Sequence, residues 1–147
     1  MKNLYISSSS AQTKKIGEVV ARRILKKGPK TKAVVLGLEG DLGAGKTTFL
    51  QGFAKGLGVK EKILSPTFVI LKKFHIPNSK FQYFYHIDCY RIEKAKDLLD
   101  LGFKEIISDP RNIVAIEWPN KIKKILPKDI AILQFDFVDL HTRKILI

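Results

Sequence analysis

Residues 40–47 (GDLGAGKT) constrain the fold of this chain more than any other stretch, because they fit the pattern G-x-x-x-x-G-K-[ST] at every fixed position. The apolar run Ala33–Leu36 before them predicts a buried strand, and apolar residues at helical spacing from Phe49 to Leu57 predict a helix after them. Glycines allow such a loop to turn tightly and to point its amide groups inward, at the positive end of the helix. The strand, loop and helix together predict a phosphate-binding loop.

Two side chains of this Walker A pattern have expected roles. The Lys46 ammonium is expected to reach the β- and γ-phosphates of a nucleotide, and the Thr47 hydroxyl to ligate Mg²⁺. The predicted cofactors are therefore ATP and Mg²⁺. The positions predicted to hold the nucleotide here are Asp41, Leu42, Gly43, Ala44, Gly45, Lys46, Thr47 and Thr48.

Acidic residues that follow apolar strands are candidates to complete the site, because the carboxyl ends of parallel strands face a phosphate loop. Asp88 follows Tyr83–Ile87, and Glu117 follows Ile113–Ile116. A helix cap or a surface ion pair is the alternative interpretation of each. His86 lies on the same strand face as Asp88 and could ligate metal or act as a base, but packing is the favoured interpretation.

The rest of the chain predicts a three-layer α/β domain of the P-loop NTPase type, with a mixed, mainly parallel sheet and a C-terminal β-hairpin. A helix is expected to begin at an N-cap Ser10 and to end at Gly28-Pro29. The core candidates of a second expected helix, over residues 94–103, are Leu98, Leu99 and Leu101. Further strands are expected over 67–71, 81–87, 113–116, 130–138 and 144–147, and a short helix over 121–126.

Length and composition favour a single domain over residues 1–147, with 45% hydrophobic and 28% charged residues. One cysteine, Cys89, allows no internal disulfide, and no apolar run approaches the length of a membrane span. We therefore expect a cytoplasmic protein with no membrane association. The formal net charge of +13 favours polyanionic partners, or reflects only a solvated basic surface.

Four motifs together resemble the TsaE (YjeE) family, in the order in which that family has them. They are GDLGAGKTTF at 40–49, SPTF at 65–68, HIDCYRI at 86–92 and IEWPNKI at 116–122. The resemblance covers nearly the full chain. This sequence departs from the family pattern at Cys89, where the family usually has leucine or a similar apolar residue.

The resemblance implies a role for individual residues. Thr47 and Glu117 are implied as the Mg²⁺ ligands, and Asp88 as the carboxylate that positions or activates the hydrolytic water. Thr67 is implied as a switch threonine, although its spacing alone favours an ordinary turn. Trp118 is implied to be important for activity without being a ligand. Thr13 and Arg143 are implied to lie near the adenosine end of the nucleotide.

The resemblance also implies partners. The family is the ATPase component of bacterial tRNA threonylcarbamoyladenosine biosynthesis, and it acts with TsaD and TsaB. ATP binding and hydrolysis are implied to reset that complex, with hydrolysis weak in the isolated subunit. Whether tRNA contacts this chain directly or through the partners stays open.

Three other functions agree with a Walker A loop. A small-molecule kinase would need an acceptor pocket and usually an arginine-bearing lid, and no insertion of lid length is evident. A small GTPase would need Asn-Lys-x-Asp, whereas residues 120–123 (NKIK) end in lysine, so ATP is expected over GTP. A nucleotide-gated binding module would bind ATP without hydrolysing it.

Overall fold

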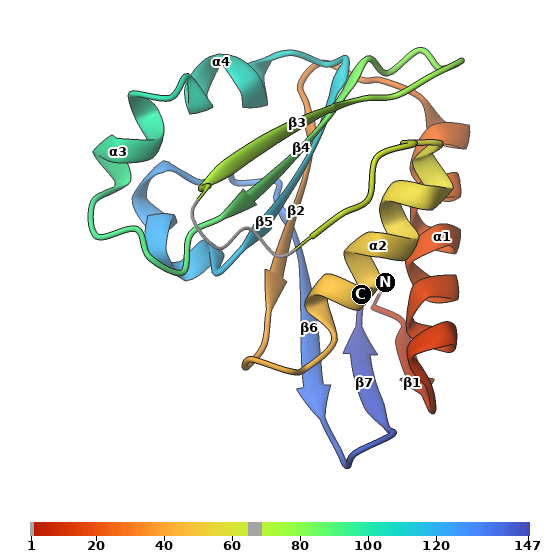
Figure 1. Ribbon diagram of the computed structural model, residues 1–147. Helices are drawn as coiled ribbons and strands as arrows, with labels where there is room; N and C mark the ends of the chain where they lie inside the picture. Colours follow the sequence, from red (N-terminus) through yellow and green to blue (C-terminus); the bar gives the residue numbers. More distant parts are fainter. Residues whose placement is uncertain (1, 65–68) are drawn as a thin grey trace.

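The computed structural model describes residues 2–64 and 69–147, and within them the strands form one seven-stranded sheet with helices on both faces (Figure 1). The strand order is β1-β7-β6-β2-β5-β4-β3. The strands are β1 Leu4–Ser7, β2 Val34–Glu39, β3 Leu71–His75, β4 Tyr83–Asp88, β5 Asn112–Glu117, β6 Ala131–Phe137 and β7 Arg143–Leu146. The helices are α1 Ser10–Lys27, α2 Lys46–Leu57, α3 Ala95–Leu99, α4 Phe103–Ser108 and the 3₁₀ segment η1 Pro119–Ile125.

The centre of the sheet is parallel and its margins are antiparallel. Strand β2 pairs in parallel with both β5 and β6, and β5 pairs in parallel with β4. The hairpin β6–β7 and the pairs β1–β7 and β3–β4 are antiparallel. The mixed sheet with a C-terminal hairpin is therefore confirmed, but the prediction that it is mainly parallel is wrong, because three of the six strand pairs in the described residues are antiparallel. This topology brings the carboxyl ends of β2, β4 and β5 to one edge.

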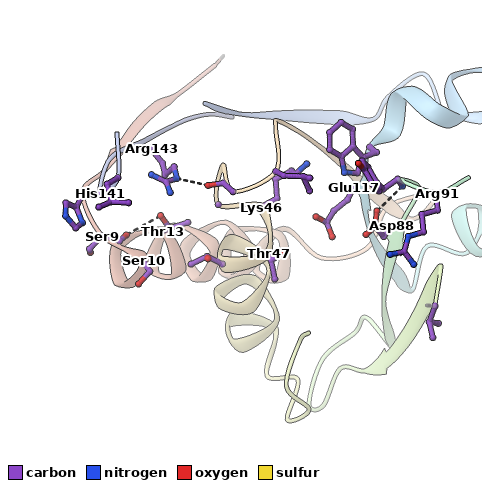
Figure 2. A pocket seen from close by; sticks show the side chains of 18 of the residues that line it. Ser9, Ser10, Thr13, Lys46, Thr47, Asp88, Arg91, Glu117, His141 and Arg143 are labelled. Atoms are coloured by element: carbon purple, nitrogen blue, oxygen red, sulfur yellow. Dashed lines mark hydrogen bonds between the residues drawn. The ribbon is translucent and has the colours of Figure 1, made fainter. Parts of the chain in front are cut away.

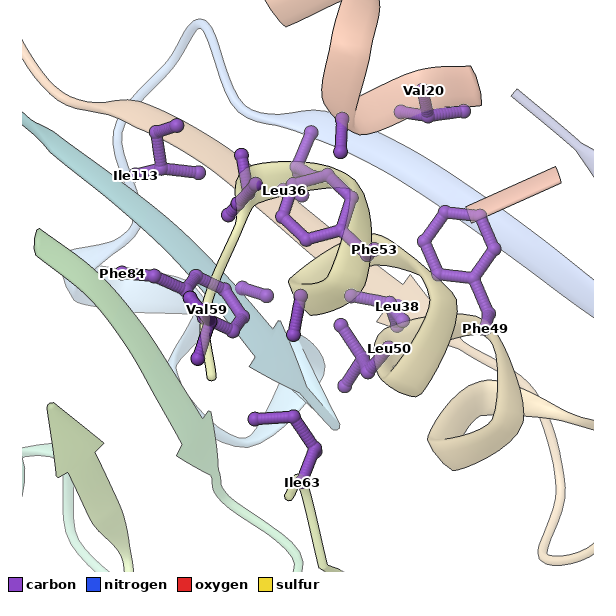
Figure 3. Close-up of a cluster of buried hydrophobic side chains, with 14 of the residues drawn as sticks. Val20, Leu36, Leu38, Phe49, Leu50, Phe53, Val59, Ile63, Phe84 and Ile113 are labelled. Atoms are coloured by element: carbon purple, nitrogen blue, oxygen red, sulfur yellow. The ribbon is translucent and has the colours of Figure 1, made fainter. Parts of the chain in front are cut away.

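Two hydrophobic clusters, one on each face of the sheet, hold the three layers together. Helices α1 and α2 pack on one face, where Phe49, Phe53 and Phe84 are fully buried (Figure 3). The segments α3, α4 and η1 cover the other face, where Leu98, Phe103 and Ile122 share a buried cluster with residues of β5. Strand β5 is buried along its whole length, as its uninterrupted apolar run predicts.

Helices α1 and α2 approach closely because glycines lie between them. A Cβ atom on Gly52 would lie 1.9 Å from the backbone carbonyl oxygen of Lys14, and one on Gly17 would lie 2.2 Å from that of Phe49. The contact leaves no space for side chains at these points. It fixes the N-terminal part of α1 beside the helix that follows the phosphate loop.

Two predicted elements differ from the structure. The predicted strand over 67–71 is wrong at Val69 and Ile70, which precede β3, while residues 67 and 68 lie outside the described residues. The extent of β3 is set by its antiparallel register with β4, from Leu71 opposite Ile87 to His75 opposite Tyr83, which local apolarity does not encode. The predicted helix over 94–103 is confirmed only as the shorter α3, and α4, which begins after Gly102 with its left-handed φ of 89°, was not predicted.

Smaller differences concern single residues and one strand. Leu98 is buried, but Leu99 and Leu101 are 38% and 52% exposed, so they are wrong as core candidates. Ser9 rather than Ser10 caps α1, because the Ser9 hydroxyl accepts the Gln12 amide at 3.1 Å. Strand β1 was not expected at all. None of the helices in the described residues combines the length and the apolar content that crossing a bilayer requires.

Candidate functional site

The loop of residues 40–45 joins β2 to α2 at the edge where the parallel strands end. Gly40, Gly43 and Gly45 have φ values of 151°, 81° and 100°, which a side chain would strain. A Cβ atom on Gly40 would also lie 2.4 Å from the carbonyl oxygen of Phe135 on β6. Gly45 occupies the N-cap position of α2 and offers no side chain to its first-turn amides. Such uncapped amides at a helix N-terminus form an anion site.

Lys46 begins α2 and is held under the loop, 5% exposed. Its Nζ donates a hydrogen bond to the carbonyl oxygen of Gly40 and lies 3.9 Å from the centroid of the Trp118 ring. Burial lowers the pKa of Lys46, and the negative charges of Glu117, Asp88 and Asp41 oppose that shift. The ammonium group thus has weak neutral partners and no direct ion pair with a described residue, which suits it to receive an anionic ligand.

Asp88 and Glu117 lie opposite each other at the ends of the adjacent parallel strands β4 and β5. Burial raises the pKa of Asp88, as does the Glu117 charge to a smaller extent, while the Tyr90 amide, which donates to Oδ1 at 3.0 Å, lowers it. The predicted position of both acids, at the same edge of the sheet, is therefore confirmed. Their oxygen atoms, with the Thr47 hydroxyl, are the hard donors that Mg²⁺ prefers.

One cavity of about 750 Å³ joins these residues to a second group at its other end. Figure 2 shows Lys46 and Thr47 between the acidic pair on one side and Thr13 and Arg143 on the other. The Arg143 Nε donates to the carbonyl oxygen of Gly43 at 3.1 Å, which ties β7 to the loop. The cavity has the volume of an ordinary small-molecule site and room for a nucleotide.

Thr13 is positioned by the start of the chain as well as by α1. Its Oγ1 lies 2.7 Å from the Ser7 hydroxyl of β1, and it is 2% exposed. The structure thus brings together Thr13, the loop and Arg143, which are 130 residues apart in sequence. Of the other predicted loop positions, Leu42, Gly43, Gly45 and Thr48 line the cavity. Asp41 and Ala44 do not: Asp41 is exposed and Ala44 is 1% exposed within the core.

The structure adds cavity residues that the sequence did not identify. They are Ser9, Ser10, Val69, Ile70, Tyr90, Arg91, Leu140 and His141. Four of these lie in stretches that stand out in the sequence, two in the serine run 7–10 and two in the motif at 86–92, but nothing in the sequence marks the hairpin tip at 140–141. Thr67 lies outside the described residues. Trp118 lines the cavity beside Lys46, in a left-handed backbone conformation with φ 59°.

Two fully buried side chains near the acidic pair, those of His86 and Cys89, complete the description of the site. His86 is fully buried, and its Nε2 lies 2.7 Å from Glu117 Oε2, so the favoured packing interpretation was incomplete. Cys89 is also fully buried, and burial raises the pKa of its thiol to about 12. A thiol with so high a pKa is a poor nucleophile at neutral pH.

Comparisons with known proteins point to one family. The model of the family described as "Threonylcarbamoyl adenosine biosynthesis protein TsaE" matches residues 7–145. The tRNA threonylcarbamoyladenosine biosynthesis protein TsaE of Treponema pallidum is 37% identical over 84% of this chain and 83% of its own length. The protein of that name from Rickettsia typhi is 33% identical over 95% of this chain and 90% of its own length.

Other relatives are longer than the stretch they share with this chain. The TsaE proteins of Bacillus subtilis and Borreliella burgdorferi are each 44% identical, over 65% and 63% of this chain, and the chain spans 56% and 64% of their lengths. The crystal structure of YdiB from Bacillus subtilis matches 99% of this chain and 84% of its own, with a TM-score of 0.79 and 29% identity. With its glycine loop at residues 40–45, its acidic pair and this agreement over residues 7–145, the chain belongs to the TsaE family.

Proposed function

We propose that this chain is the Mg-dependent ATP-binding and hydrolysing subunit required for threonylcarbamoyl modification of adenosine 37 in tRNA. It would act by resetting a complex of TsaD-type and TsaB-type subunits between turnovers. Membership of the family supports the place in tRNA modification. One observation carries the proposal of ATP chemistry: Lys46, at the N-terminus of α2, shares a cavity with two carboxylates at the ends of β4 and β5.

The residues of the cavity have complementary tasks in this proposal. Lys46 and the loop amides bind the phosphates, and the amides are supplied by a glycine-rich backbone at a helix N-terminus. Thr47 and Glu117 would hold Mg²⁺, which neutralises phosphate charge and fixes the phosphate oxygens when it is bound. Asp88, half-buried and with a raised pKa, would orient the attacking water and accept its proton.

Thr13 and Arg143 would contact the nucleoside end of the ligand, since they line the far end of the same cavity. Trp118 would hold Lys46 in place before the phosphates arrive. Thr67 is retained in the proposal as a switch threonine on the strength of the resemblance alone. The preference for ATP over GTP is part of the proposal, and it is supported by Lys123 standing where a guanine-reading Asn-Lys-x-Asp segment would have aspartate.

A turnover experiment with the assembled complex tests the proposal. We expect phosphate release from Mg-ATP, slow for the isolated chain and faster with TsaD-type and TsaB-type subunits. The variants Asp88→Asn and Glu117→Gln should retain binding of a fluorescent ATP analogue and lose at least about 100-fold in turnover, the first because it removes the general base and the second because it removes a ligand of Mg²⁺. Unchanged turnover in both variants would remove these residues from the proposal, and rapid transfer of phosphate to a metabolite instead of water would favour a kinase.

A further inference from the structure

The buried side chain of His86 makes a contact that the proposed roles do not use. His86 is 0% exposed on β4, and its Nε2 lies 2.7 Å from Oε2 of Glu117 on the neighbouring strand. Its other ring nitrogen, Nδ1, has no hydrogen-bond partner among the described residues. Of the two ring nitrogens, only the one facing Glu117 is thus engaged.

The strand register explains how the imidazole reaches Glu117. His86 lies opposite Ala115 on β5, while Glu117 lies two residues further along, opposite Asp88. Residues two apart on a strand share one face, and paired residues of adjacent parallel strands point to the same face. Because Ala115 is small and buried, the ring can lie across it toward Glu117. His86 therefore lies on the same sheet face as Glu117, one alternate position further from the strand ends, and it does not line the cavity.

The chemistry of the two groups determines which one donates the hydrogen bond. An ionised carboxylate only accepts hydrogen bonds, so the Nε2 of His86 must carry the proton that it shares with Oε2. A carboxylate that is 6% exposed needs such a donor, because burial without a partner is costly. The backbone of Glu117 is fixed as well, since its carbonyl oxygen accepts the Cys89 amide at 3.0 Å.

We propose that His86 is a positioning residue for Glu117, which it holds in one side-chain conformation by donating from Nε2 to Oε2. The other carboxylate oxygen, Oε1, is then the one available to a cation in the cavity that Glu117 lines. His86 does not line that cavity, so it acts through Glu117 and touches neither nucleotide nor metal. This inference rests on the proposed function, in which Glu117 is a Mg²⁺ ligand.

Hydrogen bonds to metal-ligating side chains commonly change metal affinity by about 10- to 100-fold. His86→Asn and His86→Gln form a matched pair for this test. The glutamine amide nitrogen can occupy the place of Nε2, whereas the shorter asparagine amide occupies that of Nδ1 and does not reach Glu117. We therefore expect His86→Asn to weaken the binding of Mg²⁺ to the ATP-loaded protein by about 10- to 100-fold, and His86→Gln to restore most of it.

The measurement is the Mg²⁺ dependence of binding of a fluorescent, non-hydrolysable ATP analogue, with the affinity in EDTA measured in parallel. The affinity in EDTA should stay within about twofold in both variants, because Lys46 and the loop are intact. General damage to the fold would weaken both affinities together. Equal Mg²⁺ affinities in wild type and both variants would overturn the inference, as would a His86→Gln variant no better than His86→Asn.

A second background separates an effect that passes through Glu117 from one that does not. In the Glu117→Gln protein the proposed carboxylate ligand is absent, so adding His86→Asn should change Mg²⁺ affinity by less than about twofold. A further 10-fold loss there would overturn the inference, since His86 would then act independently of Glu117. A wild-type chain whose nucleotide binding ignores Mg²⁺ would instead overturn the proposed function itself, and this inference with it.

Discussion

Lys46 illustrates how a single side chain is prepared for a ligand. Its Nζ is bonded to the Gly40 carbonyl oxygen and lies over the Trp118 ring, and both contacts are weaker than an ion pair with phosphate. A bound polyphosphate would therefore draw the ammonium away from the ring. Because Lys46 is already 5% exposed, much of the desolvation that this contact needs has occurred during folding.

The lone tryptophan of the sequence should report this movement. We expect Mg-ATP to change the fluorescence of Trp118 in a saturable way, because the cation 3.9 Å from its ring would be displaced. Lys46→Ala removes that cation, so its Trp118 emission should no longer report the nucleotide in this way. Its binding of a fluorescent ATP analogue should weaken by about 10- to 100-fold, the effect of losing one or two charged hydrogen bonds. A titration of Trp118 emission against nucleotide measures the first effect, and a titration of the analogue measures the second. A wild-type titration with no change would contradict displacement of the cation.

Cys89 gives a second test at this scale. Its thiol pKa of about 12, raised by burial above the ordinary value of 9.0, leaves about 1000-fold less thiolate than an exposed cysteine has at pH 8. We expect a thiol reagent to label the folded chain at least about 1000-fold more slowly than the chain in urea. With a chromogenic disulfide reagent, the absorbance of the released leaving group measures the two labelling rates. Comparable rates in the two states would show that Cys89 is not buried as described.

The sequence predicted single residues well where a fixed motif names them and poorly where contacts between strands decide. Lys46 and Thr47 follow from the loop pattern, and Asp88 and Glu117 from their places after apolar strands. The pairing of His86 with Glu117 depends on the parallel register of β4 and β5, across 31 positions, which no local pattern encodes. His141 joins the cavity only because the hairpin β6–β7 carries it there.

At the scale of elements, the contact between α1 and α2 sets where Thr13 lies relative to the phosphate loop. Gly52 and Gly17 allow the two helices to touch by their backbones, and Glu18 of α1 adds an ion pair to Lys55 of α2 at 3.5 Å. Lys55 is 78% exposed, so this ion pair contributes little. The close approach itself is therefore the main determinant of the helix spacing.

Gly52→Ala should test that determinant. The added Cβ would lie 1.9 Å from the Lys14 carbonyl oxygen, a backbone atom that cannot rotate away. We expect a loss of about 2 to 3 kcal/mol in the free energy of unfolding, at the upper end for overpacking. Urea denaturation measures the loss as a lower midpoint at an unchanged slope. Lys55→Ala, in the same helix, is the control and should cost under about 1 kcal/mol; equal effects would contradict a steric cause.

Among the elements, those with strong local signals were predicted and those defined by distant partners were not. Strands β2 and β5 and helix α2 have continuous or periodic apolar residues. Strand β1 has only four residues, two of them exposed leucine and isoleucine, and forms by pairing with β7 at the other end of the sequence. Gly102 divides α3 from α4 by a backbone conformation that helical periodicity cannot reveal.

At the scale of the whole molecule, the candidate site belongs to no single segment. Helix α1, the loop after β2, the ends of β4 and β5, and the hairpin β6–β7 all line the same cavity. Because these elements meet only in the folded chain, a ligand that bridges them binds the native state and not the unfolded one. Ligand binding should therefore raise the stability of the whole domain, by RT ln(1 + [L]/Kd).

A thermal unfolding experiment tests this coupling. With Mg-ATP at 100 times its Kd we expect about 2.7 kcal/mol of added stability. For a domain of this size, with about 2–4 °C per kcal/mol, the expected rise in Tm is roughly 5–10 °C. Differential scanning calorimetry measures it. The Lys46→Ala chain at the same concentrations is the control, and its Tm should rise by roughly 1–6 °C, about half of the wild-type rise or less, because a 10- to 100-fold weaker ligand adds only about 0.4–1.4 kcal/mol. An equal rise in both chains would mean that the nucleotide stabilises the fold from somewhere other than the loop after β2.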